Sequence, residues 1–89
     1  MINKFLLNEF GAKIRELRAE RNLSQEQLSF STGFHRTYIG MIERGERNIS
    51  LTNIAVFAKV FEMDISELVY FHNQNSKHSY HDYELKADS

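Results

Sequence analysis

Apolar residues recur at three- and four-residue intervals up to about position 71, which is the period of helices that bury one face. Proline is absent and glycine occurs four times, which favours helices joined by short turns over a sheet. The pattern predicts an all-α fold of five helices, over about 8–22, 24–31, 36–44, 50–61 and 64–71. Residues 5–7 either extend the first helix or pack beneath it.

Local signals mark the helix boundaries. Ser24 can cap the second helix, and Gln27, three residues later, can reach back to complete a capping box. Gly33 can adopt the left-handed conformation that a tight turn between two helices requires, and Gly45 is placed to stop the third helix. The later helices begin at similar signals: Ser50, and Asp64 with Glu67.

The same period predicts the core and an apolar surplus. The residues expected to face inward are Phe10, Ile14, Leu17, Phe30, Ile39, Ile42, Leu51, Ile54, Phe57, Ala58, Phe61, Ile65 and Leu68. Further apolar residues around the fifth helix, among them Phe71, exceed what the interior of one small chain can use. We expect a two-fold dimer to bury this surface, with an interface at Met63, Ile65, Val69 and Tyr70.

Length and composition narrow the class of protein. Eighty-nine residues allow one domain, expected over 1–72, followed by a polar tail over 73–89. The absence of cysteine excludes disulfides, thiolate zinc sites and cysteine catalysis. The apolar stretches are too short for a bilayer, and no signal peptide is recognisable, so we expect a cytoplasmic protein with no membrane partner.

Charge is divided unevenly along the chain, whose formal net charge is -1. Residues 1–50 hold eight Lys and Arg against six Asp and Glu, whereas residues 51–89 hold three against six. The first helix carries a basic face of Lys13, Arg15, Arg18 and Arg21. A basic front half is compatible with a polyanionic partner, with the acidic half turned away from it.

Metal binding and catalysis have weak support. The four histidines are His35, His72, His78 and His81, and His78 and His81 lie three residues apart beside Asp82. The segment is weakly helical and offers no framed ligand set, so we predict no metal and no cofactor. The sequence also lacks a nucleophile elbow, a phosphate loop and a recognisable pair of catalytic carboxylates, which indicates that the protein is not an enzyme.

The most informative segment is residues 23–49, where a capped short helix, a glycine turn and a second short helix follow one another. This is the arrangement of a helix-turn-helix unit, whose second helix enters the major groove of DNA. The helical period places Arg36, Thr37 and Met41 on one side, opposite Ile39 and Ile42. These three side chains are therefore predicted to face the groove.

Residues 10–69 resemble the repressor/Cro-type (XRE-like) helix-turn-helix family. RTYIGMIERGERN, with KFLLNEF upstream, looks most like the controller proteins of restriction-modification systems, which are small homodimeric autoregulators. The resemblance implies a five-helix repressor-like fold in which Arg36 and Thr37 meet base edges and an arginine of the first helix, Arg18, pairs with Glu43. It also implies contacts to the DNA backbone by Gln25, Tyr38, Arg44, Arg47 and Asn48.

His35 departs from the Ser, Thr or Asp usual at the start of the recognition helix, which predicts a weaker cap there. We place it with the base-contacting residues. The sequence therefore predicts a transcriptional regulator that binds a palindromic double-stranded DNA operator as a homodimer, with RNA polymerase as a further candidate partner. The alternative is a protein-interaction module, antitoxin-like or an adaptor, that uses the same fold without a DNA role.

Overall fold

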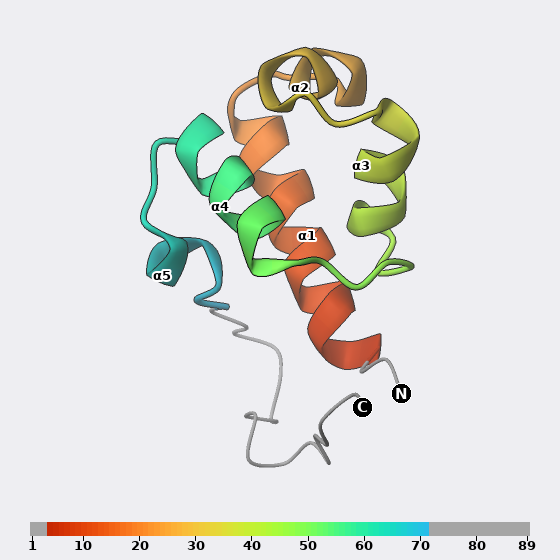
Figure 1. Ribbon diagram of the computed structural model, residues 1–89, viewed down its shortest axis with the longest axis vertical. Coiled ribbons are helices and arrows are strands. Elements are labelled where there is room, and N and C mark those ends of the chain that lie inside the picture. The colour runs from red at the N-terminus through yellow and green to blue at the C-terminus, as the bar shows by residue number, and fades with distance from the viewer. Residues whose placement is uncertain (1–3, 72–89) are drawn as a thin grey trace.

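The computed structural model describes residues 4–71, and this part of the chain is helical with no strands. Its helices are α1 (Lys4–Glu20), α2 (Gln25–Thr32), α3 (Arg36–Glu43), α4 (Leu51–Val60) and α5 (Ile65–Leu68). The long α1 and the shorter α4 lie in the middle, α2 crosses one end, and α3 and α5 lie on opposite sides (Figure 1). The predicted all-α class with five helices is confirmed for the described residues.

One buried cluster joins all five helices. It contains Phe10, Ile14, Leu17, Leu28, Ile39, Ile42, Phe57, Ala58, Phe61 and Leu68. At its centre the rings of Phe10 and Phe57 meet edge to face, with centroids 6.3 Å apart, and Phe57 stacks against Phe61 at the same distance. This core fixes α3 against α1, and so fixes the orientation of the outer face of α3.

The first helix begins at Lys4, four residues earlier than predicted, and ends at Glu20, two residues earlier. Residues 5–7 therefore extend it, and Leu7, at 6% exposure, adds to its inner face. Gly11 lets this helix approach α3 closely: a Cβ atom there would lie 2.4 Å from the backbone oxygen of Ile42. A side chain at this position would therefore push the two helices apart.

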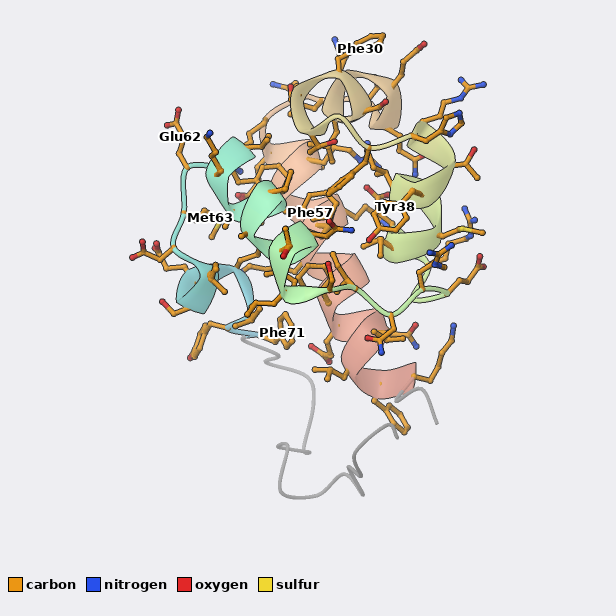
Figure 2. The ribbon with its side chains drawn as sticks, viewed as in Figure 1. Phe30, Tyr38, Phe57, Glu62, Met63 and Phe71 are labelled. Atoms are coloured by element: carbon orange, nitrogen blue, oxygen red, sulfur yellow. The ribbon has the colours of Figure 1, made fainter. Side chains whose placement is uncertain are left out.

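Three residues predicted to be in the core are exposed. Phe30 is 77% exposed and points away from the molecule (Figure 2), because α2 buries only Leu28, and a residue two positions further on faces the opposite side. Leu51 is 71% exposed at the first position of α4. Ile65 is 38% exposed, since the short α5 directs only Leu68 inward.

The last described helix is shorter than predicted, ending at Leu68 instead of about position 71. The backbone N–H of Tyr70 still bonds to the carbonyl oxygen of Glu67 in a final turn. The chain then leaves the helix, which allows the ring of Phe71 to pack edge to face on Phe10 at 6.5 Å. Phe71, counted with the apolar surplus, therefore covers the protein's own core.

The polar tail predicted over 73–89, with its alternative His78 and His81 metal site, lies outside the described residues. Between residues 4 and 71, no helix is long and apolar enough to cross a membrane. The same range contains no group of three or more His, Cys, Asp or Glu side chains placed to hold a metal ion.

Candidate nucleic-acid interface

The turn between α2 and α3 has the predicted local structure. The Ser24 hydroxyl accepts a hydrogen bond from the backbone N–H of Gln27 at 3.0 Å, and the Gln27 side chain accepts from the backbone N–H of Ser24 at 2.8 Å. This capping box fixes the first turn of α2. Gly33 follows α2 with φ of 82°, a left-handed conformation that glycine adopts without steric cost, so the chain turns sharply into α3.

His35 caps α3 through its side chain. Its ring nitrogen Nδ1 accepts a hydrogen bond from the backbone N–H of Thr37 at 3.0 Å, the role that a serine or aspartate oxygen normally fills. An imidazole acceptor thus reaches the same donor, and the weaker cap expected from the residue type stays a prediction. The remainder of this exposed ring lies beside Arg36 at the start of the helix.

The two sides of α3 differ as the helical period predicts. Ile39 and Ile42 are 0% and 1% exposed, whereas Arg36 and Thr37 are exposed and Met41 is half-buried. A shallow hollow lies between the starts of α2 and α3, lined by Gln25, Arg36, Thr37, Gly40 and Arg44. All of these residues except Gly40 were predicted from the sequence to contact DNA. The structure thus brings four predicted DNA contacts to one hollow.

A Schellman motif ends α3. The backbone N–H groups of Gly45 and Glu46 bond back to the carbonyl oxygens of Ile42 and Met41, at 3.0 and 2.8 Å. Gly45 has φ of 71° and packs against Asn8 of α1 so closely that it has no room for a Cβ atom. The chain then continues through Arg47, whose side chain is exposed.

Cations of α1 bind the carboxyl end of α3. The Lys4 ammonium donates to the carbonyl oxygen of Gly45 and the Arg15 guanidinium to that of Glu43, each at 2.8 Å. Positive charge is stabilised at this end of a helix, where the last carbonyl groups lack partners within the helix. Lys4 and Arg15 therefore hold this end of α3 against α1.

The buried carboxylate of Glu43 joins three helices. Arg18 donates to both of its oxygens, at 2.7 Å from Nε and 3.0 Å from Nη2, as the family resemblance implied. Gln25 donates its side-chain amide to the same carboxylate at 3.0 Å. Glu43 is only 4% exposed, and its hydrogen bonds to Arg18 raise the pKa of that guanidinium above its ordinary value. Gln25, predicted to contact phosphate, thus has one donor committed inside the protein.

At the outer edge of the hollow, Arg44 is paired with Glu46. The carboxylate accepts from Nε at 2.9 Å and from Nη2 at 3.2 Å, and both side chains are about half exposed. The Arg44 guanidinium lowers the pKa of Glu46 below its ordinary value, chiefly through these hydrogen bonds. Sequence reasoning did not single out Glu46, because an acid beside an expected phosphate contact has no obvious function.

Tyr38 lies between α3 and α4, on the inner side of α3 (Figure 2). Its hydroxyl oxygen accepts a hydrogen bond from the side-chain amide of Asn53 at 2.9 Å. The guanidinium of Arg47 lies 5.5 Å from the centre of its ring, and the ring of Phe34 packs edge to face at 5.0 Å. Asn53 was also missed from the sequence, although Ser50 three residues earlier marks its place in the first turn of α4.

The residues predicted to form a dimer interface gather around α5. Ile65 and Val69 are 38% and 37% exposed, and Tyr70 is 63% exposed. Met63 is half-buried and packs against the chain's own core. Next to Val69 is an apolar cavity of about 420 Å³, lined by Leu6, Leu7, Phe10, Asn48, Ile49, Ile54, Val69 and Phe71. The predicted backbone-contacting residue Asn48 is therefore at the rim of this cavity.

Comparisons with known proteins give a consistent result. The family model described as helix-turn-helix matches residues 14–68. Control protein C.BamHI of Bacillus amyloliquefaciens is 46% identical over 63 residues, which cover 70% of this chain and 78% of that protein. The crystal structure of the restriction-modification controller protein C.AhdI from Aeromonas hydrophila is 47% identical, covers 70% of this chain and 94% of its own, and has a TM-score of 0.67.

A further solved structure contains DNA. It is that of the restriction-modification controller protein C.Esp1396I, a tetramer in complex with its natural 35 base-pair operator. That protein is 30% identical to this chain, covering 75% of it and 92% of its own length, with a TM-score of 0.67.

Proposed function

Because this chain belongs to the helix-turn-helix family, we propose that it is a sequence-specific transcriptional regulator of the restriction-modification controller kind. It binds a partly palindromic DNA operator as a homodimer. The observation that carries this function is the exposed start of α3, where Arg36 and Thr37 border a hollow shared with Gln25 and Arg44. The 46% identity to control protein C.BamHI over 63 residues supports the same function.

Reading of the base sequence is assigned to the start of α3. The Arg36 guanidinium matches the O6 and N7 acceptors of guanine, and Thr37 can donate, accept, or press its methyl group on thymine. Met41 faces the same side one turn later, and His35 presents the exposed part of its capping ring beside them. Because Arg36 and Thr37 are exposed, they can reach base edges without rearrangement of the core.

Contacts to the DNA backbone are assigned to side chains that surround the exposed start of α3. Arg44 and Arg47 supply positive charge, and Tyr38, Gln25 and Asn48 supply polar groups. Gln25 and Arg44 each have protein partners, which orient them for such contacts. This group provides affinity that depends on salt and very little on sequence.

The dimer is proposed to form through α5 and the residues that follow it, with Ile65, Val69 and Tyr70 in the interface and Met63 beneath them. Their exposure leaves apolar surface that a second copy would cover. Two copies of α3 would then reach successive major-groove faces, with half-site centres about 34 Å apart or a multiple of this distance. Residues 1–72 form the binding and dimerisation domain, with 73–89 as its tail.

Regulation is proposed to act on RNA polymerase, either by occluding a promoter or by recruiting the enzyme from an upstream site. Nothing in this mechanism requires the protein to catalyse a reaction.

The decisive experiment has two parts. Selection of bound sites from a random oligonucleotide pool should return a symmetric pair of half-sites. The Arg36→Ala variant should then bind the selected operator more weakly by about 1–3 kcal/mol, with little change on random duplex. Equal losses on both DNAs would remove Arg36 as a base reader. If the wild type lacks salt-sensitive binding to any duplex, the interaction-module alternative holds instead.

A further inference from the structure

Tyr38, one of the residues assigned to the DNA backbone, lies between α3 and α4, and its hydroxyl group is bound by a side chain of α4. The oxygen accepts from the Asn53 side-chain amide, 2.9 Å away on α4. A phenolic hydroxyl has one proton to donate, and an amide N–H can only donate. The Tyr38 proton therefore points away from Asn53 and remains available to an acceptor.

The local sequence explains why Asn53 is in the right place. The hydroxyl of Ser50 accepts from the backbone N–H of Asn53 at 3.1 Å, which fixes the first turn of α4. The Asn53 side chain then extends from this turn to α3. The contact joins positions fifteen residues apart, on two helices held together by the core.

The aromatic ring of Tyr38 also has contacts within the protein, to Phe34 and Arg47. Phe34 packs against it at 5.0 Å and is in turn 5.2 Å from the buried ring of Phe57. The Arg47 guanidinium lies over the same ring at 5.5 Å from its centre, within the range of a cation–π interaction. Because Asn53 and Phe34 hold the Tyr38 ring in place, the ring also holds the guanidinium of Arg47 in place.

We propose that Asn53 is a positioning residue for DNA binding: it orients the Tyr38 hydroxyl to donate to a backbone phosphate and, through the ring, places Arg47 beside the same strand. This inference rests on the proposed DNA-binding function and adds a residue of α4, outside the helix-turn-helix unit. Asn53 itself touches no DNA in this arrangement. Phosphate is the acceptor that fits, because a hydroxyl proton and a guanidinium at one place match an anion.

A double-mutant cycle on a random-sequence duplex tests this role, because phosphate contacts act on any sequence. Tyr38→Phe should lower affinity about tenfold, and Asn53→Ala about three- to tenfold, since each removes or misdirects one hydrogen bond to a charged group. In the Tyr38→Phe background, Asn53→Ala should change affinity by less than about twofold. Equal losses from Asn53→Ala in the two backgrounds would overturn the proposal, as would an unchanged affinity of Asn53→Ala alone.

Asn53→Asp tests the direction of the hydrogen bond. The carboxylate can only accept, so it would capture the Tyr38 proton and turn it away from the DNA, and affinity should fall further than in Asn53→Ala. Asn53→Asp binding as well as the wild type would contradict the proposal. Thr52→Ala, an exposed neighbour in the same turn, serves as the matched control and should bind normally.

The contact can also be observed without DNA. In NMR spectra of the free protein, Tyr38→Phe should shift the side-chain amide resonances of Asn53, and unchanged resonances would overturn the proposal. Urea unfolding of each variant shows that the DNA measurements are made on folded protein. A wild type that fails to bind the duplex refutes the proposed function, whereas normal binding with additive Tyr38 and Asn53 effects refutes only the positioning role.

Discussion

Arg44 and Glu46 face each other in a two-point hydrogen bond, 2.9 and 3.2 Å long, at the outer edge of the hollow beside α3. The pair restrains a guanidinium that would otherwise sample many rotamers, and it places a negative charge close to the expected path of a phosphate. Glu46 is therefore expected to act on DNA binding in two opposing ways. It favours binding by orienting Arg44, and its negative charge repels the phosphates of DNA of any sequence.

Removing the charge of Glu46 should strengthen binding to DNA of any sequence. We expect Glu46→Gln to bind random duplex more tightly, with a salt dependence steeper by up to about 0.9 in log–log slope if Arg44 gains one phosphate. The measurement is titration of binding at several salt concentrations. Glu62→Gln, which removes the same charge at the far side of the molecule (Figure 2), should have a smaller effect. Equal gains from both variants would show that only net charge matters.

The same pair predicts the titration of Glu46. Its pKa is lowered from 4.5 mainly by the Arg44 hydrogen bonds, so the pairing is fully present above about that pH. It is lost as the pH falls through the lower value in the folded protein. In an NMR titration of the side-chain carboxyl groups, Arg44→Gln should move the Glu46 midpoint upward. A midpoint that is the same in both proteins would refute the pairing in solution.

The sequence predicted best where a local mechanism determines the conformation. Ser24 with Gln27, and the glycines at 33 and 45, have roles that depend on near neighbours, and the structure confirms all of them. The family resemblance is confirmed by the helix-turn-helix match and by the controller proteins among the relatives. The Arg18–Glu43 pair, which only that resemblance implied, is confirmed by its distances.

Prediction from the sequence was least accurate where contacts between distant segments determine the conformation or the burial of a residue. Phe30 looks like a core residue by type, but Leu28 already occupies the inner side of α2. The fifth helix ends at Leu68, and the ring of Phe71 beyond it packs on Phe10, some sixty positions earlier in the chain. The role of Asn53 depends on the meeting of α3 and α4, which no spacing within either helix reveals. The base- and backbone-contact assignments remain predictions.

Loss of Arg18 should destabilise the fold strongly. Arg18→Ala leaves the Glu43 carboxylate buried without its main partner, which typically costs about 3–5 kcal/mol. Arg15→Ala removes one hydrogen bond and a 3.9 Å ion pair to Glu43 from a largely exposed side chain, while Arg18 stays bound to that carboxylate, so it should cost only about 1 kcal/mol. Urea unfolding of the two variants measures the difference. Similar costs would mean that the Glu43 cluster contributes little to stability.

Glu62 offers a route to a more stable protein. It follows α4 with φ of 57°, a left-handed conformation that costs a side chain roughly 1–2 kcal/mol and glycine almost nothing. Glu62→Gly should therefore stabilise the protein by up to about 1 kcal/mol, seen as a higher melting temperature. Glu62→Ala keeps the strain and is the control. A gain of the same size from alanine would assign the effect to charge.

The exposure of Arg36 and Thr37 has a consequence for how such regulators diverge. The core is built by Ile39, Ile42 and their neighbours, so exchange of the two outer side chains leaves folding almost untouched. If Arg36 and Thr37 read bases as proposed, two descendants of one gene would come to bind different operators within a few substitutions while keeping one scaffold. Under the proposed function, several regulators built in this way would each keep to their own operator inside one cell.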